Sequence, residues 1–237
     1  MTETAPFRPF ETHLDESRAL AILKAATDGA DDGELFLERK HSEALVFDDG
    51  RLKTASFDAS EGFGLRAVRD ETAGYAHSTE ISEAALKRAA ETTRLAIGAG
   101  GGTRADGPAG TNRKLYTDAD PMADASFPVK VETLRAIDAY AREKDPRVVQ
   151  VSATVAASLQ VVHILRPDGT LVTDTRPMAR VNVGVIVEQD GRRESGGFGG
   201  GGRAGLTELI KPESWKASVD EALRIALVNL DAEPAPA

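Results

Sequence analysis

The residues of this 237-residue chain that stand out chemically form one glycine-rich run, Ser195-Gly-Gly-Phe-Gly-Gly-Gly-Gly-Arg203. Gly197, Gly199 and Gly202 satisfy the spacing G-x-G-x-x-G of dinucleotide-binding loops, although a run of glycines meets that spacing easily. The pattern also requires a parallel βαβ unit. The surrounding sequence instead predicts an antiparallel meander followed by a helix from Pro212. We therefore do not assign nucleotide binding to this run.

The same run has two other interpretations, and the sequence leaves both open. Backbone without side chains lets another chain approach closely. In the first interpretation Gly197, Gly199, Gly200 and Gly201, with Arg203, hold an extended peptide or a partner strand through main-chain hydrogen bonds. In the second, the run is a passive, mobile loop that becomes ordered only against another domain. We give slightly more weight to the loop, and keep these five residues as the candidate substrate-binding or partner-binding site.

No catalytic or metal-ligating set is recognisable in the sequence. No two of the four histidines lie closer than 28 positions, and none belongs to a helical His-Glu-x-x-His pair. Ser195 follows Glu194, so it does not form a Gly-x-Ser-x-Gly nucleophile elbow. Acidic pairs such as Asp48-Asp49 fall in predicted turns, where local backbone hydrogen bonds favour aspartate. We therefore assign no catalytic residue and no metal ligand to this chain. The histidines are His13, His41, His77 and His163.

Composition restricts the class of protein. Acidic residues number 38 and basic residues 29, a net charge of −9, which argues against binding nucleic acid by phosphate neutralisation. The lack of cysteine excludes disulfides, thiolate metal sites and cysteine nucleophiles. No apolar run approaches the roughly 20 residues of a membrane span, and residues 1–10 lack the features of a signal peptide. We expect a cytoplasmic enzyme, binding module or assembly subunit with no membrane or nucleic-acid partner.

Hydrophobic periodicity predicts the same order of elements twice: a helix, an antiparallel meander of about five short strands, and a second helix. Asp49-Gly50, Asp168-Gly169 and Asp190-Gly191 are dipeptides that favour hairpin turns. Lys40-His41-Ser42 is predicted as a further, exposed hairpin tip. Connections this short cannot form parallel crossovers. The predicted helices cover residues 12–26, 82–97, 126–141 and 212–230, and the predicted strands cover residues 35–40, 43–48, 52–57, 62–69, 74–78, 148–155, 159–165, 171–175, 179–188 and 192–195.

Internal similarity indicates that the two halves are copies of one unit. Asp49-Gly50-Arg51-Leu52 corresponds to Asp168-Gly169-Thr170-Leu171. The apolar stripe of the helix at 82–97 also aligns without a gap on that of the helix at 212–230. The predicted fold class is therefore α+β, built from duplicated helix–antiparallel β-meander–helix units. The two stripes are Leu86, Ala89, Ala90, Thr93 and Ile97, and Val219, Ala222, Leu223, Ala226 and Leu230.

The duplication predicts two modules. We place the first at residues 1–105 and the second, which contains the glycine-rich insertion, at residues 106–237. Six of the residues 98–110 are glycines, which is the composition of a flexible linker. Residues 233–237 are linker-like as well, so we expect a further domain to follow in a longer protein.

A set of motifs spread over most of the chain from about Gly33 onward resembles one known family. Together they resemble the TldD/PmbA metallopeptidases, and in particular the TldD subunit type. The motifs are Glu61-Gly62-Phe63-Gly64-Leu65-Arg66-Ala67, Gly74-Tyr75-Ala76, Leu115-Tyr116, Asp120-Pro121, Asp168-Gly169-Thr170-Leu171, Asp174-Thr175-Arg176-Pro177, Val185-Ile186-Val187-Glu188, Asp190-Gly191-Arg192-Arg193-Glu194 with the glycine run to Arg203, and Ala226-Leu227-Val228-Asn229-Leu230.

The resemblance implies the N-terminal and middle segments of a zinc metallopeptidase that hydrolyses short or unfolded peptides, in a family also labelled modulator of DNA gyrase. In that family a third segment carries a His-Glu-x-x-x-His metal motif. Members form homo- or heterodimers, commonly with a PmbA (TldE) subunit. No residue of this chain matches a family metal ligand, so the resemblance implies that the zinc binds outside it. This chain would then be inactive alone and would contribute the substrate chamber and subunit contacts.

A hypothesis from a different class stays open. The chain would be a free-standing protein-interaction or dimerisation module without hydrolase activity, which works by strand addition.

Overall fold

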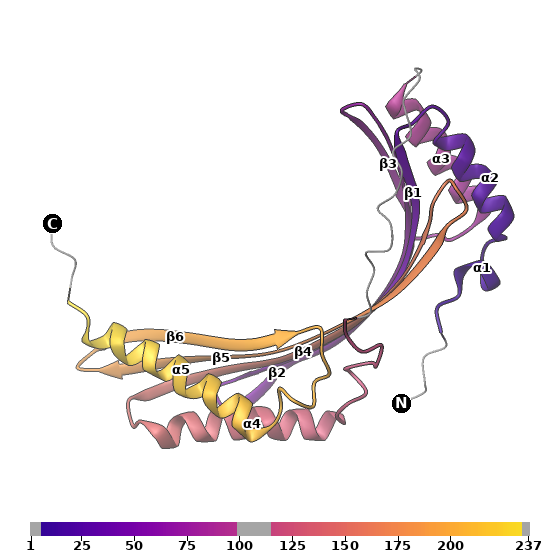
Figure 1. Ribbon diagram of the computed structural model, residues 1–237. Helices are drawn as coiled ribbons and strands as arrows, with labels where there is room; N and C mark the ends of the chain where they lie inside the picture. The colour runs from indigo at the N-terminus through magenta and orange to yellow at the C-terminus, as the bar shows by residue number, and fades with distance from the viewer. Residues whose placement is uncertain (1–5, 99–114, 234–237) are drawn as a thin grey trace. The chain divides into compact units, whose positions relative to one another are not determined.

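The computed structural model describes residues 6–98 and 115–233. Figure 1 shows how its helices and strands follow one another. Each half of the sequence contains three strands that are preceded and followed by helices, which confirms the predicted α+β class. No helix in the described part is long and apolar enough to cross a membrane. The helices are α1 (Pro9–Thr12), α2 (Glu16–Ala26), α3 (Glu83–Ile97), α4 (Phe127–Lys144) and α5 (Pro212–Asp231), and the strands are β1 (Asp32–Asp48), β2 (Arg51–Arg69), β3 (Thr72–Ser78), β4 (Val148–Leu165), β5 (Leu171–Gln189) and β6 (Arg192–Gly202).

Each half contains three strands in place of the five short ones predicted. β1, β2, β4 and β5 run unbroken through positions where the sequence predicted breaks. The predicted hairpin tip at Lys40-His41-Ser42 is wrong, because these residues lie inside β1. The hydrophobic alternation pauses there because the three odd-numbered residues between Leu37 and Leu45 are polar, although they share a face with both leucines. A break in hydrophobicity is therefore not a break in the strand.

The hairpin turns form where the aspartate–glycine dipeptides predicted them. Asp49 and Gly50 have φ values of 49° and 75°, and Asp190 and Gly191 have values of 52° and 81°. Both residues of a type I′ turn need positive φ, which explains the choice of these residue types. The third turn is of another kind, since only Gly169 has a positive φ there, at 92°.

The six strands are ordered β3-β2-β1-β4-β5-β6 in one sheet. β1, from the first half of the sequence, therefore pairs with β4, from the second half. Three side-chain hydrogen bonds cross this pair, each donated by β4 or the residue that follows it. In an antiparallel pair one residue number rises as the other falls, so their sum is constant unless a bulge adds a residue. The sum is the same for all three pairs. The pairs are Asp32 with Arg166 (2.7 Å), Glu38 with Gln160 (2.5 Å) and Asp48 with Gln150 (2.9 Å).

The chain divides into two compact units, and each unit takes strand segments from both halves of the sequence. The predicted module boundary between residues 105 and 106 lies outside the described residues, as do most of the predicted linker and residues 234–237. The modules 1–105 and 106–237 stay a prediction. Unit 1 comprises Met1–Lys40, Ala59–Lys114 and Gln160–Thr175, and unit 2 comprises His41–Asp58, Leu115–Leu159 and Arg176–Ala237.

In unit 1, α2 and α3 pack on the sheet. The Asp15 side chain accepts the Arg18 N–H (2.9 Å) and starts α2, so this helix begins later than the sequence predicted. The Ser82 hydroxyl accepts the Ala85 N–H (3.1 Å) and starts α3 where predicted. All five residues of the predicted α3 stripe are buried. The centre of this core is formed by Leu23, Leu35, Leu37, Leu65 and Leu86.

In unit 2, α4 and α5 pack on one face of the sheet, as Figure 1 shows. All five residues of the predicted α5 stripe are buried, and Trp215 joins them. The odd-numbered residues of β5 from Ala179 to Val187 are buried beneath the helices. The even-numbered residues of this stretch therefore lie on the opposite face. The core includes Leu134, Ile137, Val151, Val183, Val219 and Ala226.

A buried ion pair ties α4 to β1 within unit 2. The Lys130 side chain is 2% exposed and pairs with the Glu43 carboxylate, which is 19% exposed. The Lys130 ammonium also donates to the Met122 carbonyl oxygen at 2.8 Å. A buried ammonium needs such partners because it has lost its water. The pair therefore accounts for Glu43, which is one of the three polar residues that interrupt the hydrophobic alternation of β1.

Removing one partner of this pair will destabilise unit 2. In Lys130→Met the Glu43 carboxylate keeps its burial and loses its counter-ion, so the free energy of unfolding should fall by about 3–5 kcal/mol. Urea denaturation monitored by the fluorescence of Trp215, the single tryptophan, measures this. The control is Lys144→Met, which breaks an exposed pair with Asp220 (2.9 Å) and should cost less than about 1 kcal/mol. Equal losses in the two variants would contradict the assignment.

Candidate functional site

The glycine-rich run is the greater part of strand β6. Residues 192–202 pair antiparallel with β5, from Arg192 opposite Gln189 to Gly202 opposite Ala179. The interpretation as a passive loop is therefore wrong for these residues, because their backbone is held in a regular ladder. Gly197, Gly199, Gly200 and Gly201 all lie in this strand, and Arg203 directly follows it.

Among the strands that the structure describes, none pairs with the outer edge of β6. β6 is the last strand of the sheet, and in the described part of the chain only β5 bonds to the main chain of residues 196–202. At the start of the strand the edge differs, since the Asn229 amide donates to the Ser195 carbonyl oxygen at 3.1 Å. An uncovered edge presents a row of main-chain N–H and C=O groups that another extended chain can bond.

Gly196 faces α5 at a distance that no side chain permits. A Cβ atom there would overlap the Ala222 carbonyl oxygen and come within 2.5 Å of the Ala226 nitrogen. By contrast, a Cβ at Gly202 would meet nothing within 4 Å. The lack of a side chain at Gly196 therefore allows α5 to lie directly on the edge strand.

On the opposite face, side chains of β5 extend over β6. A Cβ at Gly199 would lie 2.3 Å from the Asn182 Oδ1 atom, and a Cβ at Gly201 would come within 2.9 Å of the Arg180 Cβ. The Arg180 Nε donates to the same Asn182 Oδ1 at 2.7 Å. The two glycines therefore leave room for a joined Arg180–Asn182 pair above the edge strand. Sequence reasoning missed this pair, although the buried odd-numbered valines of β5 indicate its face.

Arg203 lies at the end of β6 against a tyrosine. Its guanidinium donates to the Tyr116 hydroxyl at 3.0 Å and lies 4.9 Å from the centre of the Tyr116 ring. The hydrogen bond and the cation–π contact together restrain an exposed side chain. The sequence identified Arg203 but gave no signal that Tyr116 contacts it.

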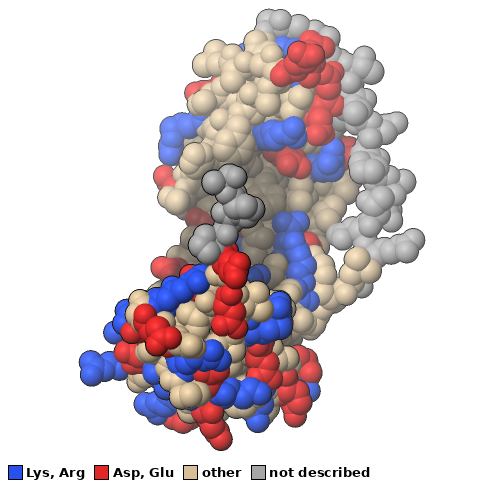
Figure 2. All heavy atoms as spheres, turned by 90° about the vertical axis from the view of Figure 1, so that its left-hand side faces the viewer, with Lys and Arg blue, Asp and Glu red and all other residues tan. Residues whose placement is uncertain are grey.

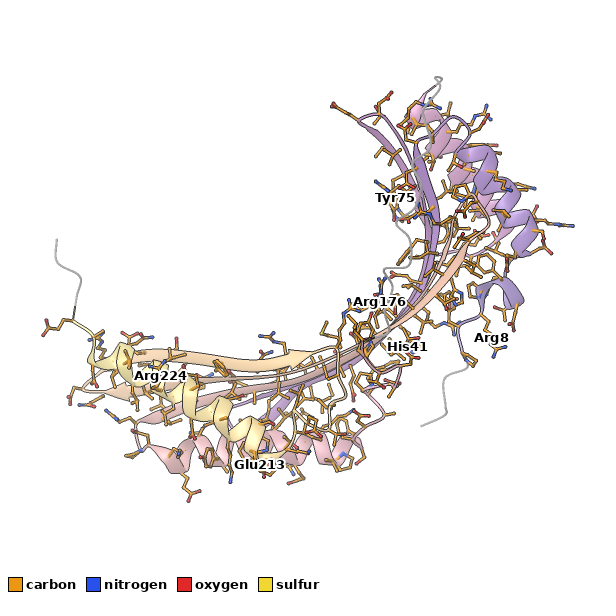
Figure 3. The ribbon with its side chains drawn as sticks, in the orientation of Figure 1. Arg8, His41, Tyr75, Arg176, Glu213 and Arg224 are labelled. Atoms are coloured by element: carbon orange, nitrogen blue, oxygen red, sulfur yellow. The ribbon has the colours of Figure 1, made fainter. Side chains whose placement is uncertain are left out.

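The two helices that pack on this part of the sheet, α4 and α5, also contact each other. The Tyr140 and Trp215 rings meet edge to face, with centres 5.7 Å apart. The Asp220 carboxylate pairs with Lys144 and raises the pKa of that amine through their hydrogen bond. Further out on α5, Arg224 pairs with Glu221 at 2.7 Å, which lowers the pKa of that carboxyl group. Figure 3 labels Glu213, which lies in the first turn of α5, and Arg224, which lies further along the same helix.

Charges of both signs are mixed around these elements. Figure 2 shows Lys, Arg, Asp and Glu side chains interspersed over the face that it presents. At the start of β6, Arg192 pairs with Glu194 (3.1 Å) and Arg193 pairs with Glu188 (2.5 Å). The basic side chains at that end are therefore already neutralised by neighbours.

The histidines do not assemble a metal centre. In the described residues, no three His, Asp or Glu side chains lie together as a group that could hold a metal ion. These residues therefore do not fit a zinc site. Figure 3 labels His41 on β1 and Tyr75 on β3. The neighbours are Glu61 for His13 (3.9 Å), the Phe57 ring for His41 (5.9 Å between centres), the Tyr75 ring for His77 (5.7 Å) and the Phe7 carbonyl oxygen for His163 (3.0 Å).

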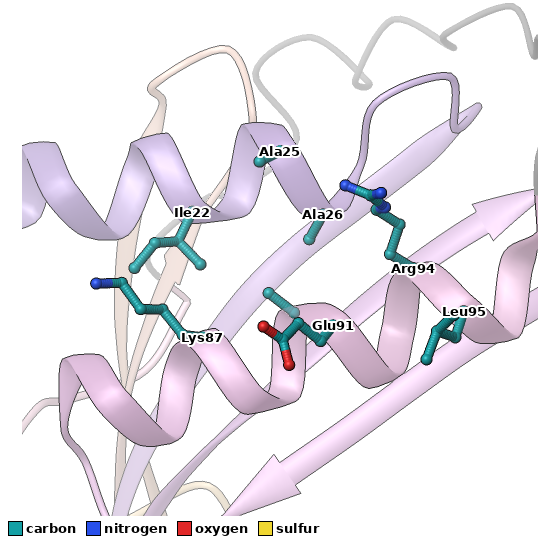
Figure 4. A pocket seen from close by; sticks show the side chains of 8 residues that line it. Ile22, Ala25, Ala26, Lys87, Glu91, Arg94 and Leu95 are labelled. Atoms are coloured by element: carbon teal, nitrogen blue, oxygen red, sulfur yellow. The ribbon is translucent and has the colours of Figure 1, made fainter.

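A separate groove lies between α2 and α3 in unit 1. Figure 4 shows Ile22 of α2 and Leu95 of α3 beside the charged side chains of Lys87, Glu91 and Arg94. The groove has a volume of about 500 Å³. It contains no nucleophile–base pair, so it does not compete with the β6 edge as a candidate site.

Comparison with known proteins connects this architecture to one family. The model of the PmbA/TldA metallopeptidase domain 1 matches residues 33–97, and that of the PmbA/TldA metallopeptidase central domain matches residues 120–230. The chain belongs to the PmbA/TldD metallopeptidase family. The resemblance inferred from the sequence motifs is thereby confirmed.

Two curated relatives of this PmbA/TldD-family chain carry the name metalloprotease TldD homolog. The one from Haemophilus influenzae is 34% identical over 215 residues, which cover 87% of this chain and 44% of the relative. The one from Buchnera aphidicola subsp. Acyrthosiphon pisum is 29% identical over 228 residues, which cover 93% and 47%. The chain therefore spans less than half the length of these relatives.

Solved structures share the fold of this chain. A modulator of a DNA gyrase from Thermotoga maritima superposes with a TM-score of 0.70 at 15% identity, covering 93% of this chain and 49% of that one. TldE from Thermococcus kodakarensis superposes with a TM-score of 0.66 at 15% identity, covering 92% and 49%. At this identity the likeness concerns the fold alone.

A methyl group on Gly196 will disturb the packing of α5 on β6. In Gly196→Ala the helix backbone must move, because the Ala222 carbonyl oxygen lies only 2.1 Å from the position of the new Cβ. We expect a loss of about 1–3 kcal/mol in the free energy of unfolding. Gly202→Ala, in open space of the same strand, should change it by less than about 0.5 kcal/mol. Thermal unfolding followed by Trp215 fluorescence compares the two, and equal midpoints would refute the close approach.

Proposed function

We propose that this chain is the N-terminal, non-catalytic portion of a TldD-type zinc metallopeptidase that hydrolyses short or unfolded peptides. Its part is to hold the peptide in an extended conformation along β6. The peptide lies along Gly197, Gly199, Gly200 and Gly201, with Arg203 at the end of the strand. It bonds the main-chain groups of those alternate residues of β6 that point away from β5. Such binding depends little on peptide sequence, because main-chain groups are common to all residues.

The uncovered edge of β6 is the observation that carries this proposal. The strand is fixed by β5 on one side and by α5 on one face, so its outer N–H and C=O groups are already in the extended geometry that a peptide needs. Pre-formed geometry lowers the entropy cost of binding. Membership of a metallopeptidase family supports a peptide as the occupant.

The proposal places the metal outside this chain. The relatives are named metalloproteases, and a bound zinc ion would supply a Lewis acid and a metal-activated water for peptide hydrolysis. The described residues offer no ligand set for it, so no catalytic step is assigned to them. Their contribution is to bind and orient the peptide. In this proposal a C-terminal catalytic domain completes the substrate chamber, and the protein acts in the cytoplasm.

The proposal also includes subunit contacts, in a homodimer or in a heterodimer with a PmbA/TldE-type subunit. The shared fold of TldE from Thermococcus kodakarensis supports partners of similar architecture. In unit 2, the segment of β2 at residues 51–58 carries exposed apolar side chains. Leu52 is 36% exposed there and Phe57 is 63% exposed. Exposed apolar residues on a strand are common at protein–protein contacts.

N-methylated peptides test strand addition directly. A strand added to β6 bonds it through one of its two edges, so only alternate residues of the peptide donate N–H groups to the protein. We expect N-methylation of one alternate set to abolish binding of a fluorescein-labelled decapeptide, and of the other set to leave binding nearly unchanged. Fluorescence anisotropy with the 237-residue chain measures both. Equal effects of the two sets would overturn the binding mode.

The location of the metal is tested by comparing two proteins. The gene product that continues past residue 237 should contain an in-frame His-Glu-x-x-x-His motif, bind about one zinc per chain and hydrolyse peptides. The 237-residue chain should retain far less than one zinc after dialysis and show no peptidase activity. Elemental analysis and a quenched fluorescent peptide measure these. A tightly bound zinc with activity in the short chain would refute the proposal, and an unrelated downstream sequence would favour the free-standing interaction module.

A further inference from the structure

We propose that the β6 edge selects peptides that carry a carboxylate opposite its C-terminal end, through Arg180 with Arg203. This inference rests on the proposed peptide binding and adds a substrate class to it. The carboxylate belongs either to an acidic side chain or to the C-terminus of the peptide, since the same guanidinium chemistry recognises both.

The first argument is the position of Arg180. Its Nε bonds to the Asn182 Oδ1 atom at 2.7 Å, and that oxygen lies 2.3 Å from the place that a Cβ of Gly199 would take. The bond therefore draws the guanidinium toward an oxygen that lies against the edge strand. An added strand would lie two strand spacings, about 10 Å, from β5. A long arginine side chain directed across two residues without side chains covers most of that distance.

The second argument is charge. In the part of the chain that the structure describes, neither Arg180 nor Arg203 pairs with a carboxylate, and their bonds go to neutral oxygens of Asn182 and Tyr116. At the other end of the strand, Arg192 and Arg193 have acidic partners. Phe198, 47% exposed, lies in the middle of the strand. Among the described residues, the positive charge without an acidic partner therefore lies at the Arg203 end of the strand. A peptide carboxylate is the complementary group at that end.

The third argument is geometry within the pair. In the described residues the hydrogen bond to Asn182 uses one of the five N–H groups of Arg180 and restrains its guanidinium. The terminal nitrogens stay available as a fork that matches the two oxygens of a carboxylate. Asn182 acts here as a positioning residue, since it orients Arg180 and leaves the carboxylate to it.

Three labelled decapeptides with one common extended sequence test the inference on the 237-residue chain. One carries glutamates and a C-terminal amide, one carries glutamines and an amide, and one carries glutamines and a free C-terminus. We expect one of the two carboxylate peptides to bind about tenfold more tightly than the glutamine amide. The one that does identifies the carboxylate as side-chain or terminal.

Variants separate this inference from the proposed function. Arg180→Gln should reduce the preference to near one while the glutamine amide binds as before, and Arg180→Lys should restore only part of it because lysine lacks the fork. Arg224→Gln removes a charge from α5, away from the edge strand, and should leave the preference unchanged. Equal binding of all three peptides would overturn the inference and leave strand addition standing. Failure of every peptide to bind would overturn both.

Discussion

The pairing of β1 with β4 is the constraint on which the rest of the structure depends. It joins the two halves of the sequence in one sheet, and three side-chain bonds along it keep a single antiparallel register. Because both strands are long, each compact unit receives segments of both halves. The buried Lys130–Glu43 pair belongs to this arrangement, since it fastens a helix of the second half to a strand of the first. Each of the two larger cores therefore includes residues of both halves.

The glycines of β6 serve two packing requirements on opposite faces of one strand. On one face Gly196 lets α5 approach the backbone, and on the other Gly199 and Gly201 admit the Asn182 and Arg180 side chains. A strand built this way loses stability to backbone entropy, which the ladder to β5 and the helix contact offset. Its edge carries a single side chain between residues 196 and 202, that of Phe198. That edge is the basis of both proposals made for this chain.

The sequence predicted some elements well and others poorly, for identifiable reasons. The helices α3 and α5 and their buried stripes were predictable because a period of 3.6 residues is strong over four turns. The aspartate–glycine turns were predictable because few residues accept positive φ. The breaks predicted in β1 and β2 were wrong, because a polar residue can continue a strand when a distant residue bonds to it, as Arg39 bonds to Glu61 of β2. The site was predicted in part: its glycines were found, and its Arg180–Asn182 pair was not.

By itself the sequence determined the α+β class, the family, the turns and the identity of the glycine-rich segment. These follow from local periodicity, from residue types with few allowed conformations, and from motifs that can be recognised without coordinates. Only the tertiary structure decided that the glycine run is an edge strand rather than a loop. Strand order decides which main-chain groups lack a partner, and strand order depends on pairing between segments distant in the chain. For the same reason, only the folded sheet brings Arg180 and Asn182 opposite Gly201 and Gly199, which leave space beside them.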